Sequence, residues 1–209
     1  MLPERPPFRF DRAAGRYRGP TGAFVPQAQV RAYLDDALES AGKRMDALAN
    51  QLRSGEIDLI SWEVRMRREV KIVTTYSGAA AKGGWAQMTE ADYGRIGNYT
   101  RRQYEYLRGF ARDIQSGKQP LNGMVNARSK LYSESGRPLY HRIEKAEMLV
   151  RGNKQRQSIR HGRDSCAGCV MAERAGWHDI EGSTVPEIGE RECGNRCKCS
   201  WAYRVGEEA

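Results

Sequence analysis

Residues 166–199 read CAGCVMAERAGWHDIEGSTVPEIGERECGNRCKC, and they contain every cysteine of the 209-residue chain. The pattern is a Cys-x2-Cys pair, a spacer, and then a Cys-x3-Cys-x-Cys element. A Cys-x2-Cys turn directs two sulfurs to one side of a tight loop, where each can approach a tetrahedral ion at about 2.3 Å, and a second, distant element completes the four ligands. The spacing therefore predicts a structural zinc site formed from Cys166, Cys169, Cys193, Cys197 and Cys199.

Five cysteines exceed the four positions of a tetrahedral site. We expect Cys166, Cys169 and Cys197 to be ligands, while Cys193 and Cys199 compete for the last position and His178 is a further candidate. Redox-active or simply buried thiols are the alternatives, because a lone Cys-x2-Cys pair also occurs in redox motifs. The segment between the two elements is too polar to fold alone. A bound metal would stabilise it, since coordination contributes on the order of 10 kcal/mol of folding free energy to such modules.

The rest of the sequence offers no pattern for catalysis. A zinc deaminase requires a proline before its Cys-x2-Cys pair, where this chain has Ser165, and a preceding His-x-Glu element. The zincin helix, the Walker loop, the GxGxxG turn and the nucleophile elbow are also absent. His161 with Asp164 resembles a fragment of a metal-nuclease site, but partner histidines are missing. We therefore expect a protein that is not an enzyme.

Upstream of the cysteines, apolar residues recur at helical spacing and predict a mainly α body. Ser54-Gly55 and the Gly136-Arg137-Pro138 segment are typical of helix ends and starts. The sequence therefore predicts a body of about five helices, over residues 27–53, 57–76, 89–117, 124–135 and 139–150.

Three local features refine this prediction. Ile60 and Val64 are expected to face the core from the second helix. The Gly-Ala-rich run 78–84 is expected to be a flexible link. Thr89, with Asp92 three residues later, is expected to begin the third helix, although Glu or Gln would make the usual capping box.

Composition divides the chain into four parts. Residues 1–26 are rich in Pro, Gly and Arg and are expected to be an extended basic arm, either loosely attached or docked on another subunit through its aromatic residues. Residues 27–150 form the helical body and 151–163 a basic linker. Acidic residues outnumber basic ones after residue 163, so a cysteine-rich metal-binding module with short β and turn structure is expected over 164–209.

The formal net charge is +9, and the excess is concentrated between residues 101 and 163. Such an excess attracts phosphate, and the tyrosines that accompany it in 89–117 can stack on bases. The densest cluster offers five phosphate-binding candidates, Arg151, Lys154, Arg156, Arg160 and Arg163. The same charges could instead neutralise metal-bound thiolates, as could Arg174, Arg191, Arg196 and Lys198.

Membrane and secretion signals are not found in the sequence. No run of 18 apolar residues occurs, and the first 20 residues lack an apolar h-region. We therefore expect no membrane partner and a reducing cytoplasm, in which clustered cysteines bind metal or stay as free thiols rather than pair as disulfides.

The C-terminal segment resembles the signature of phage head-morphogenesis proteins, the minor capsid proteins similar to the F protein of phage Mu. The resemblance rests on RHGRDSCAGC at 160–169, Pro186-x2-Gly189, and CGNRCKC at 193–199. The family typically ends in His-Pro-Asn-Cys-Arg-Cys, of which this chain retains a version in Asn195 to Cys199. Cys193 stands near the family's histidine, and the His-Pro pair is missing. The specific match covers about a fifth of the chain.

The resemblance implies a structural virion protein of low copy number, located near the portal or the capsid interior and assembled in the host cytoplasm. Its expected partners are the portal protein, the major capsid protein and packaged DNA, within a multi-copy assembly. The alternative is a zinc-containing DNA-binding protein, and the least favoured is a metal-dependent nuclease.

Overall fold

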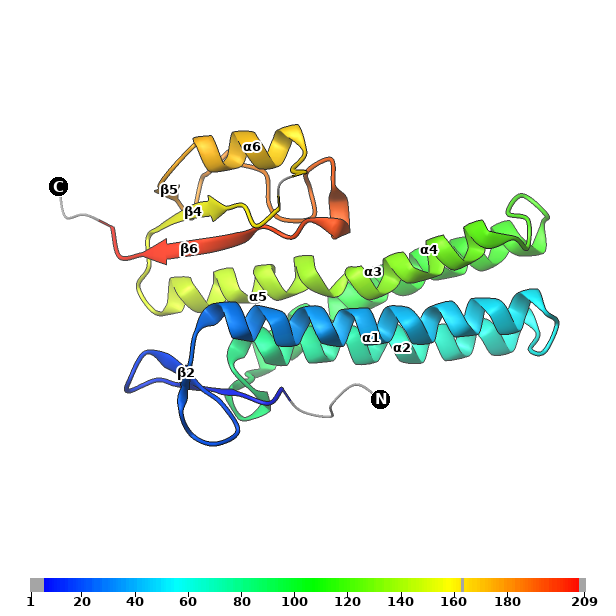
Figure 1. Cartoon of the computed structure of the whole chain (residues 1–209), viewed down its shortest axis with the longest axis horizontal. Coiled ribbons are helices and arrows are strands. Elements are labelled where there is room, and N and C mark those ends of the chain that lie inside the picture. The colour runs from blue at the N-terminus through cyan, green and yellow to red at the C-terminus, as the bar shows by residue number, and fades with distance from the viewer. Residues whose placement is uncertain (1–5, 163, 207–209) are drawn as a thin grey trace. The chain divides into compact units, whose positions relative to one another are not determined.

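The computed structural model describes residues 6–162 and 164–206, which divide after Gly136 into two units. The fold is mainly helical with short strands, as Figure 1 shows. A cysteine cluster lies near the C-terminus, and both features agree with the sequence prediction. Among the described residues, no helix is both long and apolar enough to cross a lipid bilayer.

The first unit is built on four helices and one 3-10 turn. Helix α1 packs against α2 and α4, and α2 packs against α3. The aromatic centre of this core is Trp62, whose ring is perpendicular to that of Phe110 at 5.2 Å. Tyr132 stacks on the same phenylalanine at 6.4 Å. The elements are α1 (Gln27–Arg53), α2 (Leu59–Lys82), η1 (Trp85–Gln87), α3 (Glu90–Gln115) and α4 (Gly123–Glu134).

The second helix differs from its prediction in two ways. Ile60 and Val64 are exposed, because Trp62 and Met66 define the buried face of α2. The run 78–84 is not a flexible link, since α2 continues through its buried alanines to Lys82. Alanine favours the helix, and its small side chain permits close packing. The α2 helix then ends at Gly83, which has a φ of 79°.

The predicted start of α3 is confirmed. The Thr89 hydroxyl accepts a hydrogen bond from the backbone N–H of Asp92, and the Asp92 carboxylate accepts one from the N–H of Thr89. Aspartate therefore completes the capping box here, in place of the usual Glu or Gln. Lys82 also forms an ion pair with Asp92 at 3.2 Å.

Residues 1–5 of the expected N-terminal arm lie outside the described residues, and residues 6–26 contain a small antiparallel sheet in the order β1-β2-β3 instead of an extended arm. Phe8, Phe10 and Tyr17 are buried, and the rings of both phenylalanines meet the tyrosine edge to face. The backbone N–H of Phe10 also donates to the carbonyl of Gly83 at 2.9 Å. Aromatic burial on the same chain thus orders the segment. The strands are β1 (Arg9–Asp11), β2 (Arg16–Arg18) and β3 (Phe24–Val25).

The second unit contains the cysteines and begins earlier than the sequence predicts. Its antiparallel sheet has the order β5-β4-β6, and α6 packs against β4 (Figure 1). Residues 151–163, expected to be a linker, supply the central strand of this sheet. Residues 137–150 of the last body helix belong to this unit as well. Its elements are α5 (Gly136–Val150), β4 (Gln155–Ile159), α6 (Ala167–Arg174), β5 (His178–Asp179), η2 (Gly194–Arg196) and β6 (Ser200–Arg204).

Two glycines test the packing of the first unit. A Cβ on Gly136 would lie 2.7 Å from a Leu38 methyl group and 2.8 Å from a Val73 methyl group, whereas a Cβ on Gly94 would meet nothing within 4 Å. We predict that Gly136→Ala lowers the free energy of unfolding by about 1–3 kcal/mol through overpacking. Gly94→Ala, on the exposed face of α3, should raise it by about 0.5–1 kcal/mol. Urea denaturation followed by circular dichroism measures both, and equal effects would contradict the packing at Gly136.

Candidate metal centre

The first pair of sulfurs is positioned by the start of α6. Cys166 is the N-cap residue, and its carbonyl accepts hydrogen bonds from the backbone N–H groups of Cys169 and Val170. Cys169 therefore lies one turn into the helix, on the same side as Cys166. Between them, the N–H of Gly168 donates to the Glu192 carboxylate at 2.9 Å. A Cβ at Gly168 would lie 2.6 Å from that carboxylate oxygen, so any larger residue would make the Glu192 side chain shift.

The second group of sulfurs lies on the η2 turn and at the start of β6. Cys193 and Cys197 flank η2, whose first residue, Gly194, has a φ of 54°. The N–H of Arg196 donates to the carbonyl of Cys193, and that of Cys197 to the carbonyl of Gly194. Cys199 immediately precedes β6. The turn between Cys193 and Cys197 therefore places a glycine in the left-handed region, which other residues rarely adopt.

The two elements bring all five sulfurs together. The Sγ atom of Cys169 lies 3.5 Å from that of Cys193 and 3.6 Å from that of Cys197, and all five cysteines are free thiols. Cys166, Cys169 and Cys193 form one group whose sulfurs are all within 4.8 Å of one another, and Cys169, Cys197 and Cys199 form a second. These groups can hold a metal ion, which agrees with the metal-binding prediction at this coarse level.

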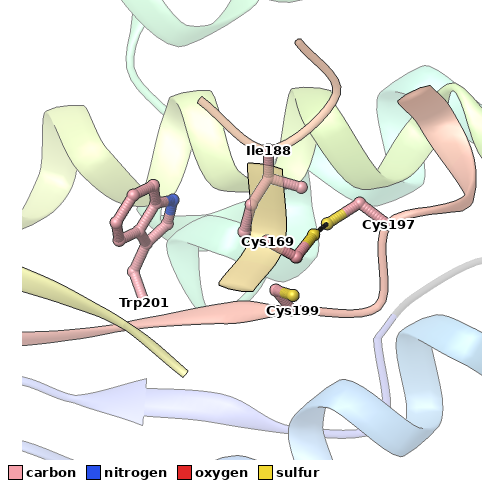
Figure 2. Close-up of a cluster of buried hydrophobic side chains, with 5 residues drawn as sticks. All are labelled: Cys169, Ile188, Cys197, Cys199 and Trp201. Atoms are coloured by element: carbon pink, nitrogen blue, oxygen red, sulfur yellow. Dashed lines mark hydrogen bonds between the residues drawn. The ribbon is translucent and has the colours of Figure 1, made fainter. Parts of the chain in front are cut away.

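The centre is enclosed by a small apolar cluster. Cys169, Cys197 and Cys199 are buried with Ile188 and Trp201, and Figure 2 shows their sulfurs gathered beside Ile188. Cysteine ligands in such surroundings are shielded from water, which favours a bound ion over hydrated thiolates.

Contacts between the thiols shift their pKa values in opposite directions. Burial and the neighbouring Cys166 raise the pKa of Cys169, although Arg191 opposes this effect. Hydrogen bonding by the Cys199 thiol lowers the pKa of Cys197 to about 5, and the same contact raises the pKa of Cys199. These contacts therefore favour deprotonation of Cys197, and the thiolate is the form that binds metals.

Two buried arginines lie beside the cysteine centre. The guanidinium of Arg191 donates to the Ser158 hydroxyl at 3.1 Å and to the sulfur of Cys169 at 3.8 Å. Its central carbon lies 5.0 Å from the ring centroid of Trp201, and that of Arg156 lies 4.0 Å from it. Arg191, which the sequence suggested as a residue that could neutralise thiolates, thus donates a hydrogen bond to the sulfur of Cys169. Sequence analysis missed Trp201 because a lone tryptophan carries no motif.

His178 belongs to neither sulfur group. Its Nδ1 atom is 2.9 Å from the carbonyl oxygen of Gly176, and its ring packs edge to face on Trp201. His161, the nuclease candidate, has its Nε2 atom 2.7 Å from the Ser200 hydroxyl. His178 therefore contacts a backbone carbonyl and Trp201 instead of joining a sulfur group, and the contact found for His161 is with Ser200.

The five phosphate-binding candidates do not form one exposed surface. Lys154 is exposed, and Arg163 lies outside the described residues. Arg156 is 1% exposed, because strand alternation directs it and Ser158 to the inner face of the sheet, so its predicted role in phosphate binding is wrong. Three candidates form internal ion pairs, Arg151 with Glu147, Arg156 with Glu187, and Arg160 with Glu173.

Comparison with known proteins adds no identification. No family model matches the chain, and no curated protein or solved structure matches it.

The ion pairs of Glu187 generate a prediction for the second unit. Glu187 contacts Arg156 at 2.7 Å and Lys145 at 2.9 Å. We predict that Glu187→Gln costs about 3 kcal/mol, because it leaves the buried Arg156 charge without a counterion. Glu190→Gln, whose partner Arg142 is exposed, should cost less than about 1 kcal/mol. Amide hydrogen exchange in β4 at pH 7 measures both. Equal protection in the two variants would contradict the assigned network.

The stability that Glu187 contributes through Arg156 and Lys145 should depend on pH. Burial raises the pKa of Glu187, but hydrogen bonds from Arg156 and Lys145 outweigh this and bring the pKa below its usual 4.5. A lowered pKa means that the carboxylate stabilises the fold above about pH 4.5 and that this contribution disappears as the pH falls through the folded-state value. The stability difference between wild type and Glu187→Gln should therefore shrink below pH 4.5. A difference that grows with acidity would have the wrong sign.

Proposed function

We propose that the second unit is a structural zinc module, and that the chain is a minor capsid or head-morphogenesis component of a phage rather than an enzyme. The observation that carries the proposal is the meeting of sulfurs from two separated turns around Cys169. Clustered thiolates are the donor set of structural zinc sites, which leave no open position for a substrate.

A stabilising role follows from the small size of the cluster. Its buried apolar residues other than cysteine are Ile188 and Trp201. So few side chains provide little hydrophobic stabilisation around the sulfurs themselves, and coordination would add to what apolar residues elsewhere in the unit, such as Ile143 and Ile180, provide. Zinc would thereby fix the loop between α6 and β6 and make the surface of the second unit rigid enough to serve as an interface.

The capsid role is supported by the resemblance of residues 160–199 and by the surface of the first unit. Ile60 and Val64, 76% and 62% exposed, lie one turn apart on α2. Leu121, which precedes α4, and Met124 in its first turn are also exposed. Exposed apolar pairs of this kind fit packing against portal or major capsid subunits.

Contact with packaged DNA is the second candidate, and its best surface is α3 rather than residues 151–163. Two glutamates and two tyrosines, Tyr93 and Tyr106, share the exposed surface of α3 with five arginines. Such a surface neutralises phosphates without reading sequence. The five arginines are Arg95, Arg101, Arg102, Arg108 and Arg112.

Metal analysis tests the zinc proposal. We predict that the reduced, purified chain contains zinc by elemental mass spectrometry. Cys166→Ser and Cys197→Ser should each lower the zinc content and destabilise the second unit, while most of the helical circular dichroism signal remains. Ser165→Ala, next to the first ligand, serves as the control and should retain zinc. A wild-type chain that folds fully without metal would contradict the proposal.

Particle composition tests the capsid role. Quantitative mass spectrometry of particles from a phage that encodes the chain should find it in far fewer copies than the major capsid protein. Absence of the wild-type chain from complete particles would refute the virion assignment.

Salt dependence tests DNA contact. We predict that Arg101→Ala combined with Arg108→Ala weakens binding to duplex DNA and reduces the slope of log affinity against log salt by about one per arginine. Arg174→Ala, an exposed arginine on α6, is the matched control and should leave the slope unchanged. Identical slopes in all three proteins would exclude α3 as the DNA-binding surface.

A further inference from the structure

The five sulfurs are arranged as two groups with one shared member. Cys169 belongs to the group with Cys166 and Cys193 and to the group with Cys197 and Cys199. Among the described residues, no set of four ligand atoms lies within 4.8 Å of one another. Cys193 and Cys197 also contact each other across the two groups, but Cys169 is the member that both groups share.

This pattern differs from that of one tetrahedral ion. At a metal–sulfur distance of about 2.3 Å, four tetrahedral sulfurs would all lie about 3.8 Å apart. Cys169 meets that spacing toward Cys193 and Cys197, at 3.5 and 3.6 Å. Each group of three sulfurs lies within 4.8 Å, close enough to be drawn onto one face of a tetrahedron, and a thiolate sulfur has enough lone pairs to bind an ion on each side.

We propose that the centre binds two thiophilic divalent ions, such as zinc or cadmium, with the Cys169 sulfur bridging them. Cys166 and Cys193 complete the sulfur ligands of the first ion, and Cys197 and Cys199 those of the second. This inference rests on the proposed zinc-binding function and specifies its ligand set and stoichiometry. It also gives a role to all five cysteines, of which a mononuclear site would leave one unused.

The surroundings of the two sulfur groups differ, so the two ions would differ in their exposure to solvent. The Glu192 carboxylate, bonded to the N–H of Gly168 and to the thiol of Cys166, lies beside the first group and is placed to be its fourth ligand. The second group consists of buried residues throughout. Three sulfurs in dry surroundings favour a soft ion there.

Arg191 supplies a positive charge at the shared sulfur. Five thiolates and the Glu192 carboxylate around two divalent ions leave two negative charges, as four thiolates around one ion also do. The buried cation of Arg191 offsets one of these charges, and it lies 3.8 Å from the sulfur of Cys169, which both ions would share.

Cadmium titration of the reduced, metal-free full chain tests the stoichiometry. Thiolate-to-cadmium absorbance should rise to two equivalents, and cadmium-113 nuclear magnetic resonance should show two signals. Saturation at one equivalent overturns the two-ion inference but leaves the proposed metal module intact. No binding overturns both. The wild-type result requires no variant, so it does not depend on whether substituted chains fold.

Variants identify the shared ligand. Cys166→Ser and Cys199→Ser should each bind one equivalent of cadmium, and Cys169→Ser should bind neither ion tightly. His178→Ala is the matched control and should retain two equivalents, because His178 belongs to neither group. Two equivalents in Cys199→Ser, or one tightly bound equivalent in Cys169→Ser, would contradict the bridging assignment.

Discussion

The approach of sulfurs from two distant turns is the constraint on which the second unit depends. The cluster around the centre contains Cys169, Cys197 and Cys199 where a larger domain would have aliphatic side chains, and Ile188 and Trp201 are buried with them. Thiols that meet at van der Waals distance provide little stabilisation alone, but they become strong ligands once deprotonated. The loop between α6 and β6 therefore keeps its conformation only while these sulfurs are held together.

Buried charge supports this arrangement. Trp201 stacks against both Arg156 and Arg191; Glu187 holds the first arginine, and the sulfur of Cys169 accepts a hydrogen bond from the second. A buried guanidinium needs a partner, and a thiolate centre provides one. The buried cation of Arg191 and the sulfur of Cys169 therefore stabilise one another. Removal of the arginine or of the thiolate would leave the other charge buried without compensation.

Sequence predicted local features well where one residue pattern decides the structure. The bounds of α1, the Thr89 cap and the convergence of cysteines followed from periodicity, capping and ligand spacing. It failed where tertiary contacts decide. The arm is a sheet because aromatic residues such as Phe10 are buried, residues 151–163 contain a central strand, and Arg156 is buried beneath a partner 31 residues away. Contacts between residues far apart in the sequence produce no periodic pattern. The positive charge of Arg156 alone suggested that it would be exposed.

Hydrogen exchange of the full, reduced chain before and after metal removal by a chelator tests the central claim most directly. The account predicts that amides of β4, α6 and β6 lose most of their protection when metal is removed, while those of α1, α2 and α3 keep theirs. Unchanged protection in β4 and β6 after complete metal removal would contradict the claim that the cysteine centre organises the second unit.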